Sequence, residues 1–324
     1  MTWLITGGAG YIGSHVVKAM VDGGEKVVVL DDLTAGDSDR LPAGVAVERA
    51  SVLDRPALDR VLAAHGVDGI VHIAARKQVG ESVERPLFYY RENLTGLQTL
   101  LEAAVDGGVR RFVFSSSAAV YGMPDVDLVT ERTPCAPMSP YGESKLAGEW
   151  LISAVGRAHG IATASLRYFN VAGAAAPELG DRGAANIVPL VFQRISQGRA
   201  PLIFGDDYPT PDGTCVRDYV HVQDVAAAHV AAARRLAADP EASLVLNIGS
   251  GQGVSVAEMV DLIREVSGHT ELEPEVAPRR PGDPARVVAS AEAIGRELGW
   301  TAQYDVRAMV ESAWAAWQLQ HPTA

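Results

Sequence analysis

The sequence predicts an α/β fold in which a parallel sheet, covered by helices on both faces, is followed by a smaller α/β region. Three observations lead to this prediction. Short apolar runs alternate with helical patterns through the first half, a glycine-spaced turn follows the first run, and loops dominate after about residue 170. Near-continuous apolar strands that alternate with helices are typical of parallel sheets buried on both faces.

The first half contains the clearest elements. The expected strands are 3–6, 26–30, 69–75, 111–116 and 161–166, and the expected helices are 11–22, 93–105 and 141–159. The helix at 141–159 has a strong start signal, because Ser139 suits the N-cap and Pro140 suits the first helical position. The helix at 11–22 is expected to end at the pair Gly23-Gly24.

The second half is richer in predicted loops than the first half. Loops are expected at 173–185, 205–214 and 277–284, with short strands and helices between them. We therefore predict a nucleotide-binding domain at 1–170 and a smaller substrate domain at 171–324. The segment 218–236 has a strand–helix pattern that we expect to rejoin the first domain.

The bulk composition narrows the function classes. The 324 residues are 48% hydrophobic and 21% charged, which is ordinary for a globular protein. A formal net charge of −12 argues against general binding to nucleic acids or anionic membranes. The two cysteines imply no disulfide framework and fit a reducing cytoplasm, and no Cys/His spacing suggests a metal site. No signal peptide is expected at the N-terminus, and no apolar run approaches the roughly 20 residues of a membrane span.

The first predicted strand–helix turn carries a dinucleotide-binding pattern. Gly7, Gly10 and Gly13 have the spacing that lets backbone N–H groups approach a pyrophosphate at a helix N-terminus. Asp31 and Asp32 close the next strand, where a carboxylate binds a ribose 2′-hydroxyl and repels a 2′-phosphate. A glycine trio alone also fits an ordinary turn, but the context favours a Rossmann-type, doubly wound sheet that binds NAD.

A second pattern points to hydride-transfer chemistry. A serine run, 115–117, ends a predicted strand, and Tyr141 and Lys145 are four residues apart on one helix face. Removing a sugar hydroxyl proton needs a base, and a free phenol, with a pKa of ~10, is too weakly acidic. A lysine ammonium and a nicotinamide cation beside Tyr141 would favour the phenolate by about 4 kcal/mol. Spacing alone would fit a surface pair, but the upstream motifs favour the catalytic interpretation.

At these residues the chain resembles the extended short-chain dehydrogenase/reductase family, and within it the UDP-glucose 4-epimerases. The resemblance is carried by TGGAGYIGSH (6–15), HIAARKQVGES (72–82), FSSSAAVYG (114–122), SPYGESK (139–145), LRYFNVAGA (166–174), DGTCVRDYVHV (212–222) and PRRPGD (278–283). The glycine turn and the Tyr-x-x-x-Lys pair mark the superfamily, and the last four stretches are more specific.

The resemblance implies a role for each matching position. The catalytic residues would be Ser117, Tyr141 and Lys145. The NAD contacts would be Gly7, Gly10, Tyr11, Ile12, Gly13, Asp31, Asp32, Ser51, Val52, Ile73, Ala74, Ala75, Lys77, Asn93, Ser115, Tyr141, Lys145 and Tyr168. The UDP-sugar contacts would be Lys77, Ser117, Tyr141, Phe169, Asn170, Asn186, Arg217, Tyr219, Arg280, Asp283 and Val287.

The resemblance implies interconversion of UDP-glucose and UDP-galactose through a 4-keto sugar, in which bound NAD accepts the hydride and then returns it. It also implies a homodimer joined by helices 93–105 and 141–159.

Two positions depart from the family pattern. Ser51 replaces an acid that commonly contacts the adenine, which puts that contact in doubt. Val287 replaces a bulky tyrosine found in many members, so we expect UDP-GlcNAc and UDP-GalNAc to be accepted as well.

Three alternatives stay open. Another UDP-sugar, such as UDP-glucuronate or UDP-xylose, could be the substrate of the same reaction. A nucleotide-sugar 4,6-dehydratase would carry an Asp-Glu pair where this chain has Ala118-Ala119. A non-catalytic NAD-sensing protein on the same fold would not need both Tyr141 and Lys145, and this chain keeps both.

Overall fold

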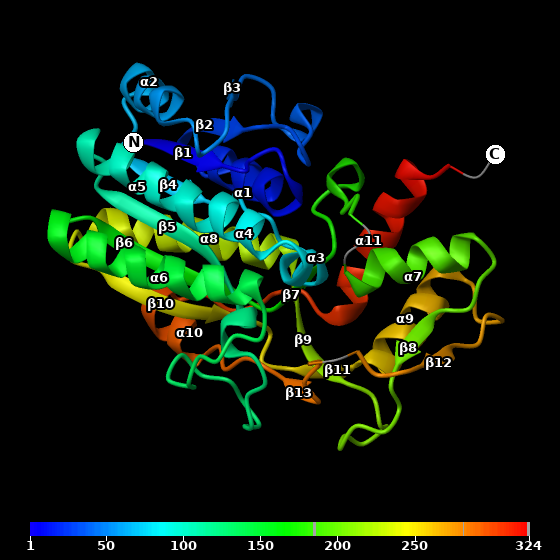
Figure 1. The fold of residues 1–324 in the computed structure, drawn as a ribbon. Helices are drawn as coiled ribbons and strands as arrows, with labels where there is room; N and C mark the ends of the chain where they lie inside the picture. Colours follow the sequence, from blue (N-terminus) through cyan, green and yellow to red (C-terminus); the bar gives the residue numbers. More distant parts are fainter. Residues whose placement is uncertain (184–185, 281, 323–324) are drawn as a thin grey trace.

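Seven parallel strands form the main sheet in a computed structural model that describes residues 1–183, 186–280 and 282–322 (Figure 1). Across the sheet their order is β10 (Ser243–Ile248), β6 (Ala162–Tyr168), β5 (Arg111–Ser117), β4 (Gly69–His72), β1 (Thr2–Thr6), β2 (Lys26–Asp31) and β3 (Ala46–Arg49). The chain winds outward from β1 through β2 to β3 and then returns to β4 on the other side of β1. This reversal is the switch point beside which doubly wound sheets bind ligands, and it confirms the predicted fold class.

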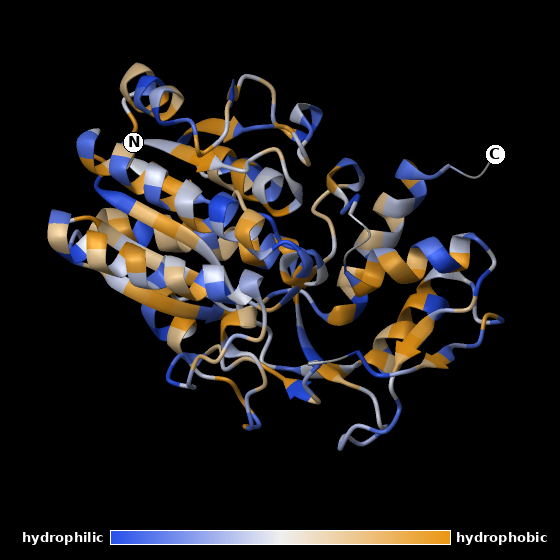
Figure 2. Cartoon of the chain, in the orientation of Figure 1, coloured by the Kyte–Doolittle hydropathy of each residue, from blue (hydrophilic) through white to orange (hydrophobic). Residues whose placement is uncertain are grey.

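Helices cover both faces of this sheet. One face carries α1 (Tyr11–Asp22), α8 (Val222–Ala238) and α10 (Glu292–Leu298), and the other carries α2 (Arg55–His65), α5 (Gly96–Asp106) and α6 (Pro140–His159). Side chains alternate along β1, so Trp3 and Ile5 join the core under α1 and α8 while Leu4 joins the core under α2 and α5. Figure 2 shows the apolar strands between the mixed helix surfaces.

The second half builds a smaller body at the carboxyl edge of the sheet (Figure 1). A four-stranded sheet has β9 (Val216–His221) at its centre, paired with β7 (Asn170–Ala172), β11 (Gly253–Ser255) and β13 (Arg286–Val287). A two-stranded sheet joins β8 (Leu202–Phe204) to β12 (Glu275–Ala277). Helices α7 (Ile187–Ser196), α9 (Val256–Ser267) and α11 (Val306–Gln320) pack around a third core.

Two elements of the second half join the layers of the main sheet: α8 covers one face and β10 adds a strand. Helix α8 packs against α1, and β10 pairs with β6 as the seventh strand. The apolar run in β10 is an edge strand that the sequence pattern did not indicate. The division of the chain into domains at residue 170 stays a prediction. The last two residues of the predicted second domain, 323–324, lie outside the described residues.

Short helical turns connect these elements. They are η1 (Ser38–Arg40), α3 (Val79–Glu84), α4 (Pro86–Tyr89), the π-helical turn η2 (Tyr90–Thr95), η3 (Ala118–Tyr121) and η4 (Pro177–Leu179). The helix expected at 93–105 is α5, which begins at Gly96, directly after the π-helical turn that contains Asn93. The predicted loops at 173–185 and 277–284 include residues 184–185 and 281, which lie outside the described part of the chain. Within the described ranges, none of the helices is both long and apolar enough to cross a membrane.

Candidate active site

The glycine turn between β1 and α1 forms a cradle bounded by backbone. Gly7 has φ +71°, and a Cβ there would lie 2.6 Å from the Ala74 nitrogen. A Cβ at Gly13 would lie 2.0 Å from the Gly7 carbonyl oxygen. Gly10 is the N-cap of α1 and makes no side-chain capping hydrogen bond, so no capping side chain competes for the first helical N–H groups. These features suit an anion such as a pyrophosphate at the helix N-terminus.

The chain that follows β4 closes over this turn. The strand expected at 69–75 ends at His72, because the N–H groups of Ile73 and Ala74 both donate to the Thr6 carbonyl, at 3.1 and 3.0 Å. This brings residues 73–75, predicted as cofactor contacts, to the mouth of the glycine turn. Tyr11, predicted with them, donates its hydroxyl to the Gly173 carbonyl at 2.6 Å and so ties the turn to the second half.

Asp31 is buried at the end of β2 and already holds the local backbone in place. Its carboxylate accepts hydrogen bonds from the Ala9 N–H at 3.0 Å and the Leu33 N–H at 2.9 Å. Burial raises the pKa of Asp31, and these two hydrogen bonds oppose that shift. Each carboxylate oxygen keeps a second lone pair, so a ribose hydroxyl can still donate to it.

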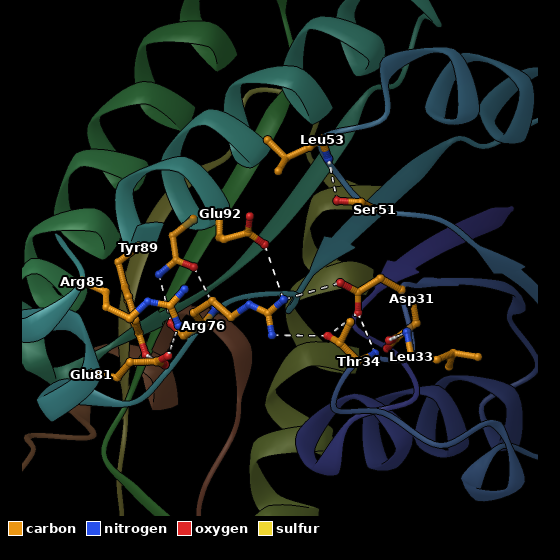
Figure 3. A network of polar contacts seen from close by, with 12 residues as sticks. Asp31, Leu33, Thr34, Ser51, Leu53, Arg76, Glu81, Arg85, Tyr89 and Glu92 are labelled. Carbon is orange, nitrogen blue, oxygen red and sulfur yellow. Dashed lines mark hydrogen bonds and ion pairs between the residues drawn. The ribbon is translucent and has the colours of Figure 1, made fainter. Parts of the chain in front are cut away.

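Arg76 is a cation of this region that the sequence pattern did not indicate, although it adjoins the predicted Lys77. Figure 3 shows its guanidinium between Thr34 and Glu92. It lies 3.7 Å from a carboxylate oxygen of Asp32 and 3.5 Å from one of Glu92, and it donates to the Thr34 hydroxyl at 3.3 Å. The predicted cofactor contact Asp32 is therefore engaged in an ion pair.

Asn93 holds the same segment from the π-helical turn. Its side-chain oxygen accepts from the Arg76 N–H at 2.8 Å, and its amide nitrogen donates to the Arg76 carbonyl and to the Ser144 hydroxyl, both at 3.0 Å. Asn93 thus positions the chain beside Lys77, whose side chain is exposed. A π-helical turn widens the helix locally, which suits a buried side chain that must reach a distant backbone segment.

The adenine end expected at Ser51 and Val52 lies beyond the end of β3. The Ser51 hydroxyl accepts from the Leu53 N–H at 3.2 Å (Figure 3). Val52 packs so closely under Gly96 that a Cβ there would lie 2.8 Å from it. Ser51 thus stabilises the local turn and Val52 packs against α5, and their contact with a cofactor stays a prediction.

The three predicted catalytic residues meet at the carboxyl edge of the main sheet. Ser139 caps α6 by accepting from the Gly142 N–H at 3.2 Å, as the sequence predicted, and Tyr141 follows on the buried face of α6. The Lys145 ammonium donates to the Ser115 carbonyl at 2.8 Å and lies 6.0 Å from the centre of the Tyr141 ring. The Ser117 hydroxyl, at the end of β5, accepts from the Ala119 N–H at 3.2 Å and lies near enough to the Tyr141 phenol to lower its pKa.

Burial controls the charges of this group. It raises the pKa of Tyr141, against the effect of the nearby Ser117 hydroxyl, and it lowers the pKa of Lys145 to about 7, against the attraction of Glu149. The sequence predicts that the Lys145 ammonium and a nicotinamide cation together acidify the phenol, and that stays a prediction. Among the residues of the chain, burial is the largest influence on both groups, and it disfavours both charged forms.

The Ser115 hydroxyl is engaged within the fold. The Nδ1 atom of His229 lies 2.8 Å from the Val225 carbonyl, which can only accept, so Nδ1 carries the proton. The Nε2 atom then accepts from the Ser115 hydroxyl at 2.9 Å. Burial raises the pKa of the Tyr168 phenol, and the nearby Ser115 hydroxyl opposes that shift. The roles of Ser115 and Tyr168 toward a cofactor stay predictions.

Strand register brings together the predicted UDP-sugar residues around β9. Asn170 on β7 pairs with Tyr219, and Val287 on β13 pairs with Arg217. The guanidinium of Arg217 forms an ion pair with Asp283.

Three other predicted contacts lie around this group. Phe169 and Val287 share a small apolar cluster with Tyr121. Arg280 stacks on the Phe204 ring of β8 at 3.9 Å, and Asn186 donates to Asp181 at 3.0 Å near the start of α7. The predicted set is therefore spread over β9 and its flanks.

Comparison with known proteins gives consistent matches over the whole chain. Residues 3–249 match the model of the NAD dependent epimerase/dehydratase family. A UDP-glucose 4-epimerase from Corynebacterium glutamicum is 44% identical over 319 residues, which cover 97% of this chain and 95% of the relative.

Solved structures agree with this match. A UDP-glucose-4-epimerase from Stenotrophomonas maltophila, with bound NAD and formylated UDP-arabinopyranose, has a TM-score of 0.95 at 39% identity, and the alignment covers 100% of both chains. The UDP-glucose 4-epimerase from Bifidobacterium longum, in complex with NAD+ and UDP, has a TM-score of 0.92 at 36% identity over 99% of each chain. With the glycine cradle, the buried Asp31 and the Ser117–Tyr141–Lys145 group in this fold, the chain belongs to the NAD dependent epimerase/dehydratase family.

Proposed function

We propose that this protein is a UDP-sugar 4-epimerase that interconverts UDP-glucose and UDP-galactose with NAD as its cofactor. One observation carries the proposal: Ser117, Tyr141 and Lys145 meet at the carboxyl edge of the main sheet, next to the switch point between β1 and β4. The substrate class is supported by relatives that are named UDP-glucose 4-epimerase and that match nearly the whole chain, such as the one that is 44% identical.

The residues of the turn fit a dinucleotide. The first N–H groups of α1, which follow Gly10, would hold the pyrophosphate. Gly7 and Gly13 have no side chain, and the backbone packs too closely there to admit one. Asp31 would accept a hydrogen bond from the ribose and would repel a 2′-phosphate, which favours NAD over NADP. Bound there, NAD supplies a reversible hydride acceptor for the sugar carbon.

The protein residues handle the proton at the sugar 4-hydroxyl. Tyr141 would take this proton as the carbon is oxidised. It would return the proton after the 4-keto sugar has rotated to present its other face. Ser117 would hydrogen-bond the same oxygen and keep it in line with the phenol. Because burial raises the pKa of Tyr141, the phenolate needs the Lys145 ammonium and the positive nicotinamide ring close by.

The binding energy is expected to come mainly from the UDP portion. Arg217 and Arg280 can hold a diphosphate with charge-assisted hydrogen bonds, and Asn170, Asn186 and Asp283 can pair with the neighbouring hydroxyls. In this structure Arg217 is paired with Asp283, so a diphosphate would share or exchange that partner. A firm grip on UDP and a loose grip on the sugar would let both sugar faces reach Tyr141.

The small side chain of Val287 favours 2-acetamido sugars as additional substrates. Val287 lies in the apolar cluster with Phe169, and a tyrosine there would add an aromatic ring to the same space. We expect turnover of UDP-GalNAc as well as UDP-galactose. Val287→Tyr should lower the rate for UDP-GalNAc more than the rate for UDP-galactose, and complete failure of the unmodified protein on UDP-GalNAc would end this idea.

The main test uses the purified protein without added cofactor. It is incubated separately with UDP-galactose, UDP-GalNAc and UDP-glucuronate, and the products are identified. Formation of UDP-glucose from UDP-galactose is the expected result. No conversion of UDP-galactose even after NAD is added would contradict the proposal, and turnover of UDP-glucuronate alone would assign the reaction to a different UDP-sugar.

We also propose that the protein is a homodimer and that it works in a reducing cytoplasm. Helices α5 and α6 pack side by side, and Trp150 of α6 exposes 66% of its surface. A large exposed aromatic side chain is typical of an interface. Both cysteines are free thiols, which fits a reducing compartment. Sedimentation should show a dimer, and Trp150→Glu should shift it toward the monomer.

A further inference from the structure

A buried ion pair lies one helical turn beyond Lys145 and has no part in the mechanism described above. Tyr141, Lys145 and Glu149 are spaced four residues apart on α6, so they share the face that packs on the main sheet. Arg167, on the neighbouring strand β6, pairs with Glu149. The side chain of Glu149 is 4% exposed and that of Arg167 is 7% exposed, so water does not screen the pair.

The two side chains are held in a fixed geometry. The Glu149 carboxylate accepts from the Arg167 Nε at 2.8 Å and from its Nη2, and so forms a two-point contact. The Ser116 hydroxyl donates to the same carboxylate. Ser116 and Arg167 are partners in the register of β5 and β6, so the sheet itself sets their separation.

A chain of hydrogen bonds fixes the far side of the guanidinium. Its Nη1 donates to the Tyr121 hydroxyl at 2.9 Å, and the Tyr121 hydroxyl donates to the Asn247 side chain at 2.6 Å. Asn247 in turn donates to the Val129 carbonyl at 2.9 Å. Arg167 therefore cannot move toward Lys145 without breaking several buried hydrogen bonds.

A buried ion pair of this kind contributes little net stability to a fold. Removing two charges from water costs free energy that their attraction only repays with good geometry, and apolar replacements are often as stable. A buried pair next to a catalytic helix therefore calls for another reason. Its position along α6 relative to Lys145 supplies one.

We propose that Glu149 and Arg167 form a positioning pair that sets the charge of Lys145. The carboxylate favours the ammonium form of Lys145, and the guanidinium on its far side limits that effect. The inference rests on the proposed function in one respect, because it assigns Lys145 to the support of the Tyr141 phenolate.

The other groups around Lys145 cannot supply this negative charge. From β5, the Phe114 ring lies 4.9 Å from the ammonium and the Ser115 carbonyl accepts from it. From β4, His72 faces it with a pKa lowered to about 3 by burial and by Lys145 itself, so it is neutral near pH 7.

The remaining neighbours are phenols. Tyr141 on α6 and Tyr168 on β6 both have pKa values raised by burial, so both are neutral near pH 7. Among all these neighbours, Glu149 carries the negative charge, and it opposes the burial that lowers the pKa of Lys145 to about 7. At that value a small change in a neighbouring charge alters the protonated fraction strongly.

The test compares three variants of the full-length protein: Glu149→Gln, Arg167→Gln and the double variant. The first removes the anion that favours the ammonium and leaves the buried Arg167 cation unbalanced, so the alkaline limb of the kcat–pH profile should move to lower pH by about one unit. The second leaves the anion unbalanced, so the limb should move to higher pH. The double variant should lie between them, near the unmodified protein. The limb reports the coupled Tyr141–Lys145 pair rather than either residue alone.

A second measurement does not depend on activity. The chain has four lysines, at positions 18, 26, 77 and 145, so isotope-labelled lysine gives few NMR signals, and Lys145→Met identifies the one that matters. The apparent pKa of Lys145 should fall in Glu149→Gln and rise in Arg167→Gln.

Tyr121→Phe is the matched control. It removes a hydrogen bond to Arg167 without changing any charge, so it should lower the melting temperature and leave the alkaline limb in place. A merely structural pair would lower stability in all variants with no opposite shifts, and that result would overturn the inference. If the unmodified protein does not convert UDP-galactose, the proposed function fails, while the NMR titration still decides whether the pair sets the charge of Lys145.

Discussion

At the scale of single residues, the chemistry of this site depends on how little water reaches it. Tyr141 is 8% exposed and Lys145 is 3% exposed. Burial favours the neutral phenol and the neutral amine, so the charged pair forms only when other charges stabilise it. In such a site the phenol stays neutral until the Lys145 ammonium and the nicotinamide cation are both beside it. It can then act as a base near neutral pH.

Replacing the catalytic phenol tests this directly. Tyr141→Phe keeps the ring and removes the proton acceptor, so kcat for UDP-galactose should fall by about 10²–10⁴. The melting temperature should change little, because the substitution keeps the packed aromatic ring. The rate is measured by product formation at saturating substrate.

Tyr90→Phe provides the comparison. Tyr90 donates its hydroxyl to Glu143, which is also on α6 but on its outer side. This variant should keep the full rate. An unchanged rate in Tyr141→Phe would remove the catalytic role of Tyr141.

At the scale of elements, the turn between β1 and α1 depends on backbone contacts that exclude side chains. Gly13 sits in the first turn of α1 against the carbonyl of Gly7, and Gly7 has a positive φ that other residues rarely adopt. The two glycines let the helix N-terminus approach β1 closely. The same closeness leaves the N–H groups available to a ligand.

Gly13→Ala should disrupt this approach. The added Cβ would lie 2.0 Å from a backbone oxygen, so the helix has to move, at a cost of about 1–3 kcal/mol in the free energy of unfolding. We also expect less NAD to copurify. Both are measured, by urea unfolding and by absorbance of the cofactor released on denaturation.

The matched control is Gly80→Ala in α3. A Cβ at Gly80 would meet nothing within 4 Å, and alanine favours a helix over glycine by about 1 kcal/mol. This variant should be at least as stable as the unmodified protein. If Gly13→Ala behaves in the same way, the turn is not as closely packed as the structure indicates.

At the scale of the whole molecule, buried histidines link parts of the chain that are far apart in sequence. His72 contacts Thr6, His229 contacts Ser115, and His221 contacts Ser312 of α11. Burial lowers the pKa of His72 to about 3 and the pKa values of His221, His229 and His15 to about 4. All four are therefore neutral in the folded protein at pH 7.

This predicts loss of stability in mild acid. Between pH 6.5 and about 4 the unfolded chain binds protons on these histidines and the folded chain does not, so the free energy of unfolding falls as the pH falls. The melting temperature should drop from pH 7.5 to pH 5. His229→Asn should be less stable at pH 7.5 but show a smaller drop. An equal drop in both proteins would exclude His229 as a contributor.

Much of the fold follows from local sequence. The helix at 11–22 has the predicted ends, and α6 starts at Pro140 behind its Ser139 cap as predicted. The parallel sheet follows from apolar runs separated by helices. These features depend on residues a few positions apart, for which side-chain periodicity and capping preferences are decisive.

The sequence by itself determined the family, the glycine turn and the Tyr141–Lys145 pair, because each is a pattern of fixed spacing. Only the tertiary structure placed β10 at the edge of the main sheet, paired Arg76 with Asp32, and set Glu149 against Arg167 beside the catalytic lysine. Those contacts join residues brought together by strand order and packing. Their charges depend on burial, which is a property of the assembled core and of no single segment.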